Sequence, residues 1–355
     1  MRAPLIRQPR ASSDQILSNT RPTKTTLSAN EISRGRYGGA RVLVTGATGL
    51  IGSRLVHRLL EEAAEVHALI LPEVEEQSEL VRSGDLQRLT VHGGRLESQP
   101  SVEEAVRATA PEFVFHLGAQ SLVGVARGDP VGTFTANVAG TWYLLDACRR
   151  LEDVPKAVAV ASSDKAYGVS DKLPYVETDP VGGSVEPYEA SKAITDIVSR
   201  TYAASYGLPI RIARCGNVYG RGDWNWSRII PGTIRSLLRA ERPVVRSDGT
   251  YIRDYVHVDD VVEGYLILGA RDLTPGEAFN FSSGERYSVL EVIERIQVAM
   301  GTDLEPLIKD EARGEIPVQY LDSSKARGRL GWNPVRRLEE SLPSVIQWYR
   351  ELLSE

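Results

Sequence analysis

The stretch Arg41-Val-Leu-Val-Thr-Gly-Ala-Thr-Gly-Leu-Ile-Gly52 decides the fold of this chain. A short β-rich run, 41–45, leads into glycines at 46, 49 and 52 and then into an amphipathic helical segment, 49–60. This order is typical of a dinucleotide-binding βαβ unit, because the glycines let the backbone approach a pyrophosphate at the helix N-terminus. A purely structural turn is the alternative, and the required order of strand, glycines and helix favours cofactor binding.

Further apolar runs lie at 66–71, 89–92, 113–117, 157–162 and 209–213. They alternate with helical segments such as 134–151 and 186–206. This alternation predicts an α/β fold, a Rossmann doubly wound parallel sheet with helices on both faces. The rhythm breaks after Arg214, which predicts a smaller, loop-rich α/β substrate domain. The predicted division is an N-terminal arm, 1–37, a dinucleotide-binding domain, 38–213 and 251–283, and a substrate domain, 214–250 and 284–355.

Composition narrows the class of protein. The net charge of −5 over 355 residues argues against a nucleic-acid partner, yet it allows a small anionic substrate. The cysteines, Cys148 and Cys215, and five scattered histidines have no metal-ligand spacing, so we expect no metal site and a reducing, cytoplasmic location. No apolar run is long enough for a membrane span. Segment 1–37 has seven Lys or Arg, two acids and no apolar signal core, so it is interpreted as a flexible arm, with a transit peptide as the alternative.

A candidate reaction centre lies in the helical segment 186–206. Tyr188 and Lys192 are four residues apart and therefore share one helix face. We expect the Lys192 cation to lower the pKa of the Tyr188 phenol, which would let it act as a general base. An incidental surface pair is the alternative.

A second group, Ser163-Asp164-Lys165, follows the strand-like run 157–162. Ligands of doubly wound sheets bind at the carboxyl ends of the strands, where this group is predicted to lie. Ser163 could hold an oxygen that is being oxidised, and Asp164 could protonate a leaving hydroxyl. Lys165 could accept a carbon-bound proton if burial keeps it neutral. A solvated Asp–Lys surface pair is the alternative.

An ordered set of motifs resembles the extended short-chain dehydrogenase/reductase family over about residues 38–350. The motifs are TGATGLIG (45–52), HLGAQ (116–120), DPVGTFTANVAGT (129–141), SSDKAYG (162–168), YEASK (188–192), RCGNVYG (214–220), RDYVHVDD (253–260) and LGWNP (330–334). The resemblance implies an NAD-dependent epimerase or dehydratase acting on a nucleotide-diphosphate sugar, and a homodimer is expected.

Within that family the chain is most similar to CDP-glucose 4,6-dehydratases, through Ser163-Asp164-Lys165 and the run from Gly216 to Pro231. This resemblance implies a lyase that oxidises C4, eliminates water across C5 and C6, and returns the hydride to give a 4-keto-6-deoxy sugar. It makes Ser163, Tyr188 and Lys192 the oxidising group and Asp164 and Lys165 the dehydration pair. An epimerase of the same family and a non-catalytic dinucleotide-binding module stay open as alternatives.

Binding residues follow from the same motifs. The expected cofactor contacts are Gly46, Thr48, Gly49, Leu50, Ile51, Gly52, Arg95, Leu96, Leu117, Ala119, Tyr188 and Lys192. The expected substrate contacts are Gln120, Asn217, Arg228, Arg246 and Arg253. Guanidinium groups suit a diphosphate because they bind it in a planar fork, and the resemblance favours Arg253. Ile70-Leu71-Pro72 occupies the place of the acid that would bind a ribose 2′-hydroxyl, but Glu73 is the nearest acid and no arginine is there for a 2′-phosphate, so NAD is favoured with NADP open.

Overall fold

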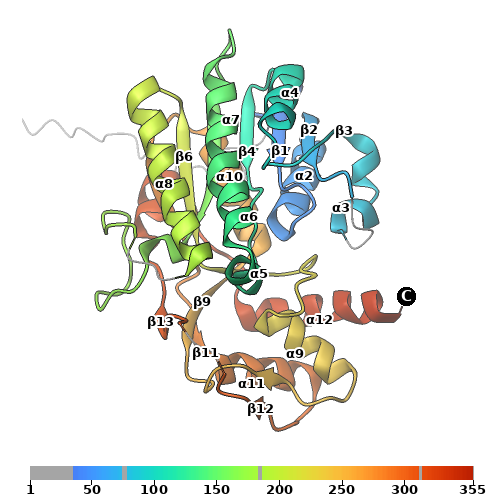
Figure 1. The fold of residues 1–355 in the computed structure, drawn as a ribbon. Helices are drawn as coiled ribbons and strands as arrows, with labels where there is room; N and C mark the ends of the chain where they lie inside the picture. The colour runs from blue at the N-terminus through green and yellow to red at the C-terminus, as the bar shows by residue number, and fades with distance from the viewer. Residues whose placement is uncertain (1–34, 74–77, 183–185, 312–313, 355) are drawn as a thin grey trace, which may run out of the picture.

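The computed structural model describes residues 35–73, 78–182, 186–311 and 314–354. Seven parallel strands form its central sheet in the order β10-β6-β5-β4-β1-β2-β3 (Figure 1). They are β1 (Arg41–Thr45), β2 (Glu65–Ile70), β3 (Thr90–Gly93), β4 (Phe113–His116), β5 (Ala157–Ser163), β6 (Ile210–Cys215) and β10 (Glu277–Phe281). The strand order reverses between β1 and β4, so the predicted Rossmann doubly wound sheet is confirmed.

Helices cover both faces of this sheet, because the strand residues are apolar on both sides. Val42 and Val44 of β1 face one core cluster, which α2 (Leu50–Glu61) and α10 (Val258–Ala270) complete. Leu43 faces the opposite cluster, under three further helices. These are α4 (Gln99–Thr109), α7 (Gly140–Arg149) and α8 (Pro187–Tyr206).

Local signals fix several helix ends. Pro187 occupies the first turn of α8, where its missing N–H costs nothing. Ser288 and Glu291 form a capping box at the start of α11 (Val289–Met300). Short helices and turns complete the connections: α3 (Glu79–Arg82), α5 (Val123–Gly128), α6 (Pro130–Phe134), the 3-10 turns Asp85–Arg88 and Asp164–Tyr167, and the π-helical turns Thr135–Ala139 and Ala326–Leu330.

A smaller unit lies below the central sheet in Figure 1. Its sheet is centred on β9 (Ile252–His257), which pairs with β7 (Asn217–Tyr219) and β13 (Val318–Gln319) in parallel and with β11 (Arg286–Ser288) in antiparallel. Helices α9 (Ile229–Leu238), α11 and α12 (Leu338–Ser354) share a second core there. The strands β8 (Val244–Val245) and β12 (Leu307–Ile308) form a separate pair.

The observed packing differs from the predicted division in three places. Strand β9 belongs to the smaller sheet, although segment 251–283 was assigned to the dinucleotide-binding domain. Trp332, assigned to the substrate domain, packs on Phe281 and donates to the Asp260 carbonyl at 2.7 Å, within the main core. Tyr37, assigned to the arm, is fully buried and donates to the Leu266 carbonyl at 2.6 Å. The rest of the predicted arm, 1–34, lies outside the described residues.

The described residues contain neither a helix that could span a membrane nor a group of side chains that could hold a metal ion. In that part of the chain, no helix has both the length and the apolar character needed to cross a membrane. Across the same residues, no group of three or more His, Cys, Asp or Glu side chains is arranged to hold a metal ion.

Candidate functional site

The glycine-rich turn between β1 and α2 has the shape that a dinucleotide needs. Gly46 has a φ of +71°, and a Cβ there would meet the Gly118 nitrogen at 2.6 Å. A Cβ on Gly52 would meet the Gly46 carbonyl oxygen at 2.0 Å. Gly49 caps α2 without a side-chain hydrogen bond, so the first-turn N–H groups face outward for phosphate oxygens. The residues therefore fit an NAD pyrophosphate.

The other expected cofactor residues lie around this turn. Leu50 and Ile51 pack partly on the core, and the Thr48 carbonyl accepts from Ser78 Oγ at 3.1 Å. Leu117 and Ala119 follow β4, at the carboxyl edge of the sheet. Leu96 lies against the same edge, because a Cβ on Gly118 would meet its Cδ1 at 2.8 Å.

Arg95 and Glu73 form an exposed ion pair with an N–O distance of 2.7 Å. The sequence indicated Glu73 as the acid after the second strand and no arginine beside it. The fold brings Arg95 there from the end of β3. Glu73, a possible acceptor for a ribose hydroxyl, therefore lies beside the cation of Arg95. The sequence spacing did not reveal this arrangement.

Gly46→Ala should weaken NAD binding by about tenfold or more, since forcing a methyl group into a filled space costs about 1–3 kcal/mol and 1.4 kcal/mol is tenfold. Gly39→Ala is the matched control, because Gly39 also has a positive φ, +69°, but has open space around a Cβ. Titration calorimetry with NAD and thermal melting of both variants give the comparison. Equal NAD affinity of two folded variants would contradict the role of Gly46.

The polar group at the end of β5 is held by its own hydrogen bonds. The Ser163 hydroxyl donates to Asp164 Oδ1 at 2.8 Å and accepts from the Lys165 backbone N–H at 3.2 Å. Lys165 Nζ lies 3.7 Å from Asp164 Oδ2. That buried Oδ2 has no hydrogen-bond partner among the described residues. The carboxyl therefore keeps one oxygen for a ligand, which is what a proton donor to a substrate requires.

Tyr188, in the first turn of α8, comes to the same group. Burial and the Asp164 charge raise the pKa of its phenol to about 12, although Arg228 and hydrogen bonding with Ser163 lower it. The expected lowering by Lys192 is not found. Lys192 Nζ instead donates to the Ala161 carbonyl at 2.9 Å, and burial lowers the pKa of Lys192 to about 8. Ser163 and Arg228 are therefore the groups that favour a Tyr188 phenolate.

Lys165 has the environment that a neutral amine needs. Burial lowers its pKa, Arg253 adds to this effect, and the carboxylates of Asp164, Glu189 and Asp254 oppose it. These interactions also place Arg253, from β9, close to the end of β5. The smaller sheet thus brings a guanidinium to the carboxyl edge of the central sheet.

Two acids in this cluster were missed as site residues. Burial raises the pKa of Glu189 to about 7, and the Asp164 charge adds to the shift. Burial and the same charge raise the pKa of Asp254 to about 7. Both lie inside motifs quoted for the resemblance, YEASK and RDYVHVDD, but the motifs alone do not show which carboxyls are buried.

Two buried amides were also missed. Asn137 accepts from the Gln120 N–H at 2.6 Å and donates to Ser191 Oγ at 2.9 Å, so it joins the loop after β4 to α8. Gln319, from β13, contacts both Lys165 and the Asp164 backbone. Asn137 lies in the DPVGTFTANVAGT motif, which was a signal, whereas Gln319 lies in none.

The expected substrate residues differ in how closely they are connected to this cluster. Arg253 and Arg228 act on Lys165 and Tyr188 through their charges, and Asn217 donates to the Asp254 carbonyl at 3.3 Å beneath them. Gln120 lies in the loop after β4 and accepts from the Leu122 N–H at 2.8 Å. Arg246 is exposed and donates to the Ser227 carbonyl at 3.4 Å, next to Arg228 in the chain.

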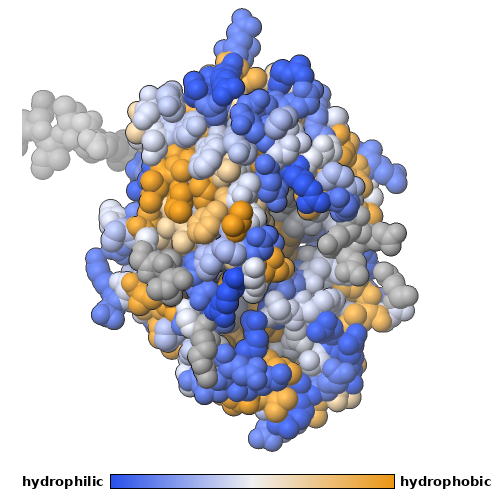
Figure 2. All heavy atoms as spheres, viewed as in Figure 1, coloured by the Kyte–Doolittle hydropathy of each residue, from blue (hydrophilic) through white to orange (hydrophobic). Residues whose placement is uncertain are grey.

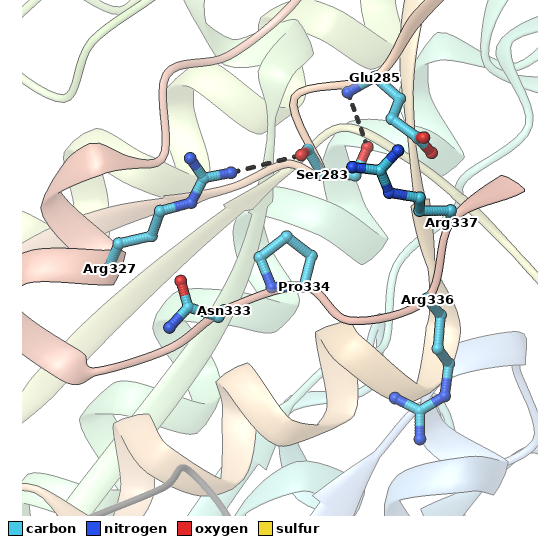
Figure 3. Close-up of a pocket in the computed structure, with 7 residues that line it drawn as sticks. All are labelled: Ser283, Glu285, Arg327, Asn333, Pro334, Arg336 and Arg337. Atoms are coloured by element: carbon cyan, nitrogen blue, oxygen red, sulfur yellow. Dashed lines mark hydrogen bonds between the residues drawn. The ribbon is translucent and has the colours of Figure 1, made fainter. Parts of the chain in front are cut away.

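Figure 3 shows a separate polar hollow of about 260 Å³. It is lined by Ser283, Glu285, Arg327, Asn333, Pro334, Arg336 and Arg337, none of which is an expected site residue. Arg336 already pairs with Asp260 at 2.5 Å, and Glu285 accepts from the Leu338 N–H at 3.0 Å. The candidate site is therefore the cluster at the ends of β4 and β5, not this hollow.

Known proteins resemble most of this chain in sequence and in fold. The model of the NAD-dependent epimerase/dehydratase family matches residues 42–281. The chain is 32% identical to a CDP-glucose 4,6-dehydratase of Salmonella typhimurium, with 90% of this chain and 93% of that protein covered. It is also 32% identical to a UDP-glucose 4-epimerase of Mycolicibacterium smegmatis, covering 87% and 98%. A dTDP-glucose 4,6-dehydratase structure from Streptomyces venezuelae with NAD bound has a TM-score of 0.78 and 28% identity, covering 88% and 97%.

Proposed function

Because the chain belongs to the NAD-dependent epimerase/dehydratase family, we propose that it is a nucleotide-sugar 4,6-dehydratase with a CDP-glucose-like substrate. The observation that carries the proposal is the Asp164–Lys165 pair beside Tyr188. An epimerase needs a base and NAD for the ketone, but it needs no acid at C6. Asp164 keeps one buried carboxyl oxygen without a hydrogen-bond partner in the described chain, next to a lysine whose pKa burial lowers.

The residues divide the reaction between them. NAD bound at the glycine turn would supply the hydride acceptor for C4 and the hydride donor for C6, and its cationic ring would favour the phenolate of Tyr188. Tyr188 accepts the proton of the 4-hydroxyl, and the Ser163 hydroxyl turns from Asp164 Oδ1 to donate a hydrogen bond to the same oxygen. The resulting 4-ketone makes the C5 hydrogen acidic.

Elimination then needs an acid and a base together. The neutral amine of Lys165 accepts the C5 proton, and the electron pair of that bond forms the C5–C6 double bond. Protonated Asp164 donates to the 6-oxygen, which leaves as water. Lys165 returns its proton to C5 when C6 is reduced, and the proton that Tyr188 took from the 4-hydroxyl passes through Ser163 to Asp164, so that all three groups are restored. The product is a 4-keto-6-deoxy sugar.

Arg253 and Arg228 are the proposed diphosphate ligands, with Asn217 and Gln120 as neutral contacts and Arg246 at the outer end. Their guanidinium groups provide paired donors for a dianion, and Arg253 is held by donation to the Ile252 and Pro317 carbonyls at 2.8 and 3.1 Å. Arg228 is held by Asp223 at 3.1 Å. A diphosphate bound between them would direct the sugar toward Lys165 and Tyr188.

The test is product analysis of the full-length protein with NAD and each of CDP-, dTDP-, GDP- and UDP-glucose. The expected result is a product lighter than its substrate by one water, formed fastest from CDP-glucose. A product of unchanged mass with an inverted carbon would instead establish the epimerase. Absence of turnover with every sugar nucleotide would favour the dinucleotide-binding module.

We also propose that the chain forms a homodimer through the outer faces of α7 and α8. Figure 2 shows an apolar patch over these helices, and Trp142, Ile194 and Ile197 are exposed there by 39%, 37% and 48%. Such a contiguous apolar surface usually marks an interface. Ile197→Glu should shift the protein from dimer to monomer in sedimentation, whereas the exposed Val298→Glu on α11 should not. A parent protein that sediments as a monomer would remove the proposal.

A further inference from the structure

Gln319 is a buried amide that touches both members of the dehydration pair. Its Oε1 accepts from Lys165 Nζ, and its Nε2 donates to the Asp164 carbonyl at 3.0 Å. The side chain is fully buried in β13, more than 150 residues along the chain from Lys165. We propose that Gln319 is a positioning residue that holds Lys165 in place to accept the C5 proton, an inference that rests on the proposed dehydratase reaction.

The chemistry of the two contacts requires an amide at this position. A lysine amine or ammonium group offers N–H donors to Gln319, and the Asp164 carbonyl offers an acceptor. With the amide turned over, its NH₂ would face the lysine donors and its oxygen would face another oxygen. Leucine could make neither hydrogen bond, and glutamate could make only the first. Glutamine meets both demands in one orientation.

A neutral acceptor also suits a base that must lose its charge. Three carboxyl groups, those of Asp164, Glu189 and Asp254, already raise the pKa of Lys165 against the effect of burial whenever they are ionised. A fourth carboxylate would favour the ammonium form further and leave less free amine. Gln319 accepts a hydrogen bond without adding a charge, so it can fix the amine and leave it able to accept a proton.

The position of Gln319 joins the base to the substrate-binding side. In the β13–β9 pairing, Gln319 is the register partner of Arg253, and Arg253 donates to the Pro317 carbonyl two residues earlier. Segment 317–319 therefore contacts the proposed diphosphate ligand on one side and Lys165 on the other. A long lysine side chain loses considerable rotamer entropy when it is fixed, and this buried contact fixes it before substrate arrives.

The test uses Gln319→Leu and Gln319→Glu in the full-length protein with NAD and CDP-glucose. Gln347→Leu and Gln347→Glu are matched controls, since Gln347 is an exposed glutamine of α12. In Gln319→Leu, deuterium entry at C5 and 6-deoxy product should fall by about 10²-fold, the scale of a misplaced catalytic group. Reduction of NAD in a single turnover should change little, because C4 oxidation uses Tyr188.

Gln319→Glu supplies a second, independent readout. Its carboxylate stabilises the ammonium form of Lys165, so the pH at which elimination reaches half its maximal rate should move upward. A side chain at position 319 that did not contact Lys165 would not move this pH. If Gln319→Leu does not fold, the pH profile of Gln319→Glu decides, and an unmoved profile in that folded variant overturns the inference.

Lys165→Met distinguishes a failure of the proposed dehydratase mechanism from a failure of the role proposed for Gln319. If it exchanges C5 at the parent rate, Lys165 is not the base and the proposed mechanism fails, together with this inference. If Lys165→Met loses exchange while both Gln319 variants keep the parent rates and pH profile, only the role of Gln319 is wrong. Equal loss of NAD reduction and C5 exchange in the Gln319 variants would also overturn it, since it would indicate general disruption.

Discussion

Replacing Tyr188 by phenylalanine should reduce turnover of the nucleotide sugar by about 10²- to 10⁴-fold, the usual contribution of an acid–base group. Sugar-nucleotide binding should change little, because the diphosphate ligands are on other elements. Tyr188 is the phenol that Ser163 and Arg228 act on, and the variant keeps its ring but loses its ionisable oxygen. Steady-state turnover and calorimetric titration with the sugar nucleotide measure the two quantities.

Tyr206→Phe is the matched control, because Tyr206 ends the same helix, α8, and is exposed. It should leave turnover unchanged. The pH dependence gives a further check. Since burial raises the pKa of Tyr188, the phenolate fraction and kcat/KM of the parent should increase with pH, and the phenylalanine variant should lack that increase. Parent-like kcat in Tyr188→Phe would show that another group is the base.

Most of the central sheet could be predicted from the sequence because its signal is local. The predicted runs 41–45, 66–71, 113–117 and 157–162 differ from β1, β2, β4 and β5 by one residue at most at either end, whereas β10 was not predicted as a strand. Burial on both faces makes such strands continuously apolar, so they are distinct from the helices between them. The glycine turn and the order of motifs were equally local, and the predicted family is confirmed.

The division into two units was less predictable because it depends on pairing between distant segments. The sequence of strand β9 does not identify its sheet, and only its partners β7, β11 and β13 show which sheet it joins. Trp332 is adjacent in sequence to the smaller unit, but its ring fits against Phe281 in the main core. Local patterns describe an element and do not identify the surface it packs on.

The candidate site shows the same limit at the level of side chains. Ser163, Asp164 and Lys165 were placed correctly at a strand end, and the structure brings Tyr188 to them, although their roles stay predictions. Gln319 has no such signal, because it lies in a two-residue strand far along the chain. Its proposed function depends entirely on tertiary contacts. The pKa of Tyr188 also depends on them, because burial raises it, whereas the sequence predicted that Lys192 would lower it.

Replacing Asp164 by asparagine should separate oxidation from elimination. The amide oxygen can still accept from Ser163, as Oδ1 does at 2.8 Å, so the arrangement at the end of β5 should persist. The variant has no carboxyl proton, and hydroxide is a poor leaving group near neutral pH. Formation of the 6-deoxy sugar should therefore fall by about 10²- to 10⁴-fold. C4 oxidation should survive, because it uses Tyr188, Ser163 and Lys192.

Three measurements on Asp164→Asn follow these steps one by one. In a single turnover, absorbance of the reduced nicotinamide should still appear, and deuterium from solvent should still enter C5 through Lys165, while mass spectrometry should find little 6-deoxy product. Asp171→Asn, an exposed aspartate in the loop after β5, should behave as the parent in all three. A variant that forms 6-deoxy sugar at the parent rate would exclude Asp164 as the acid. A parent enzyme whose product keeps its 6-oxygen would remove the need for any acid at C6, because an epimerase and a dehydratase share the steps up to the ketone and only the dehydratase then needs the elimination that Asp164 and Lys165 carry out.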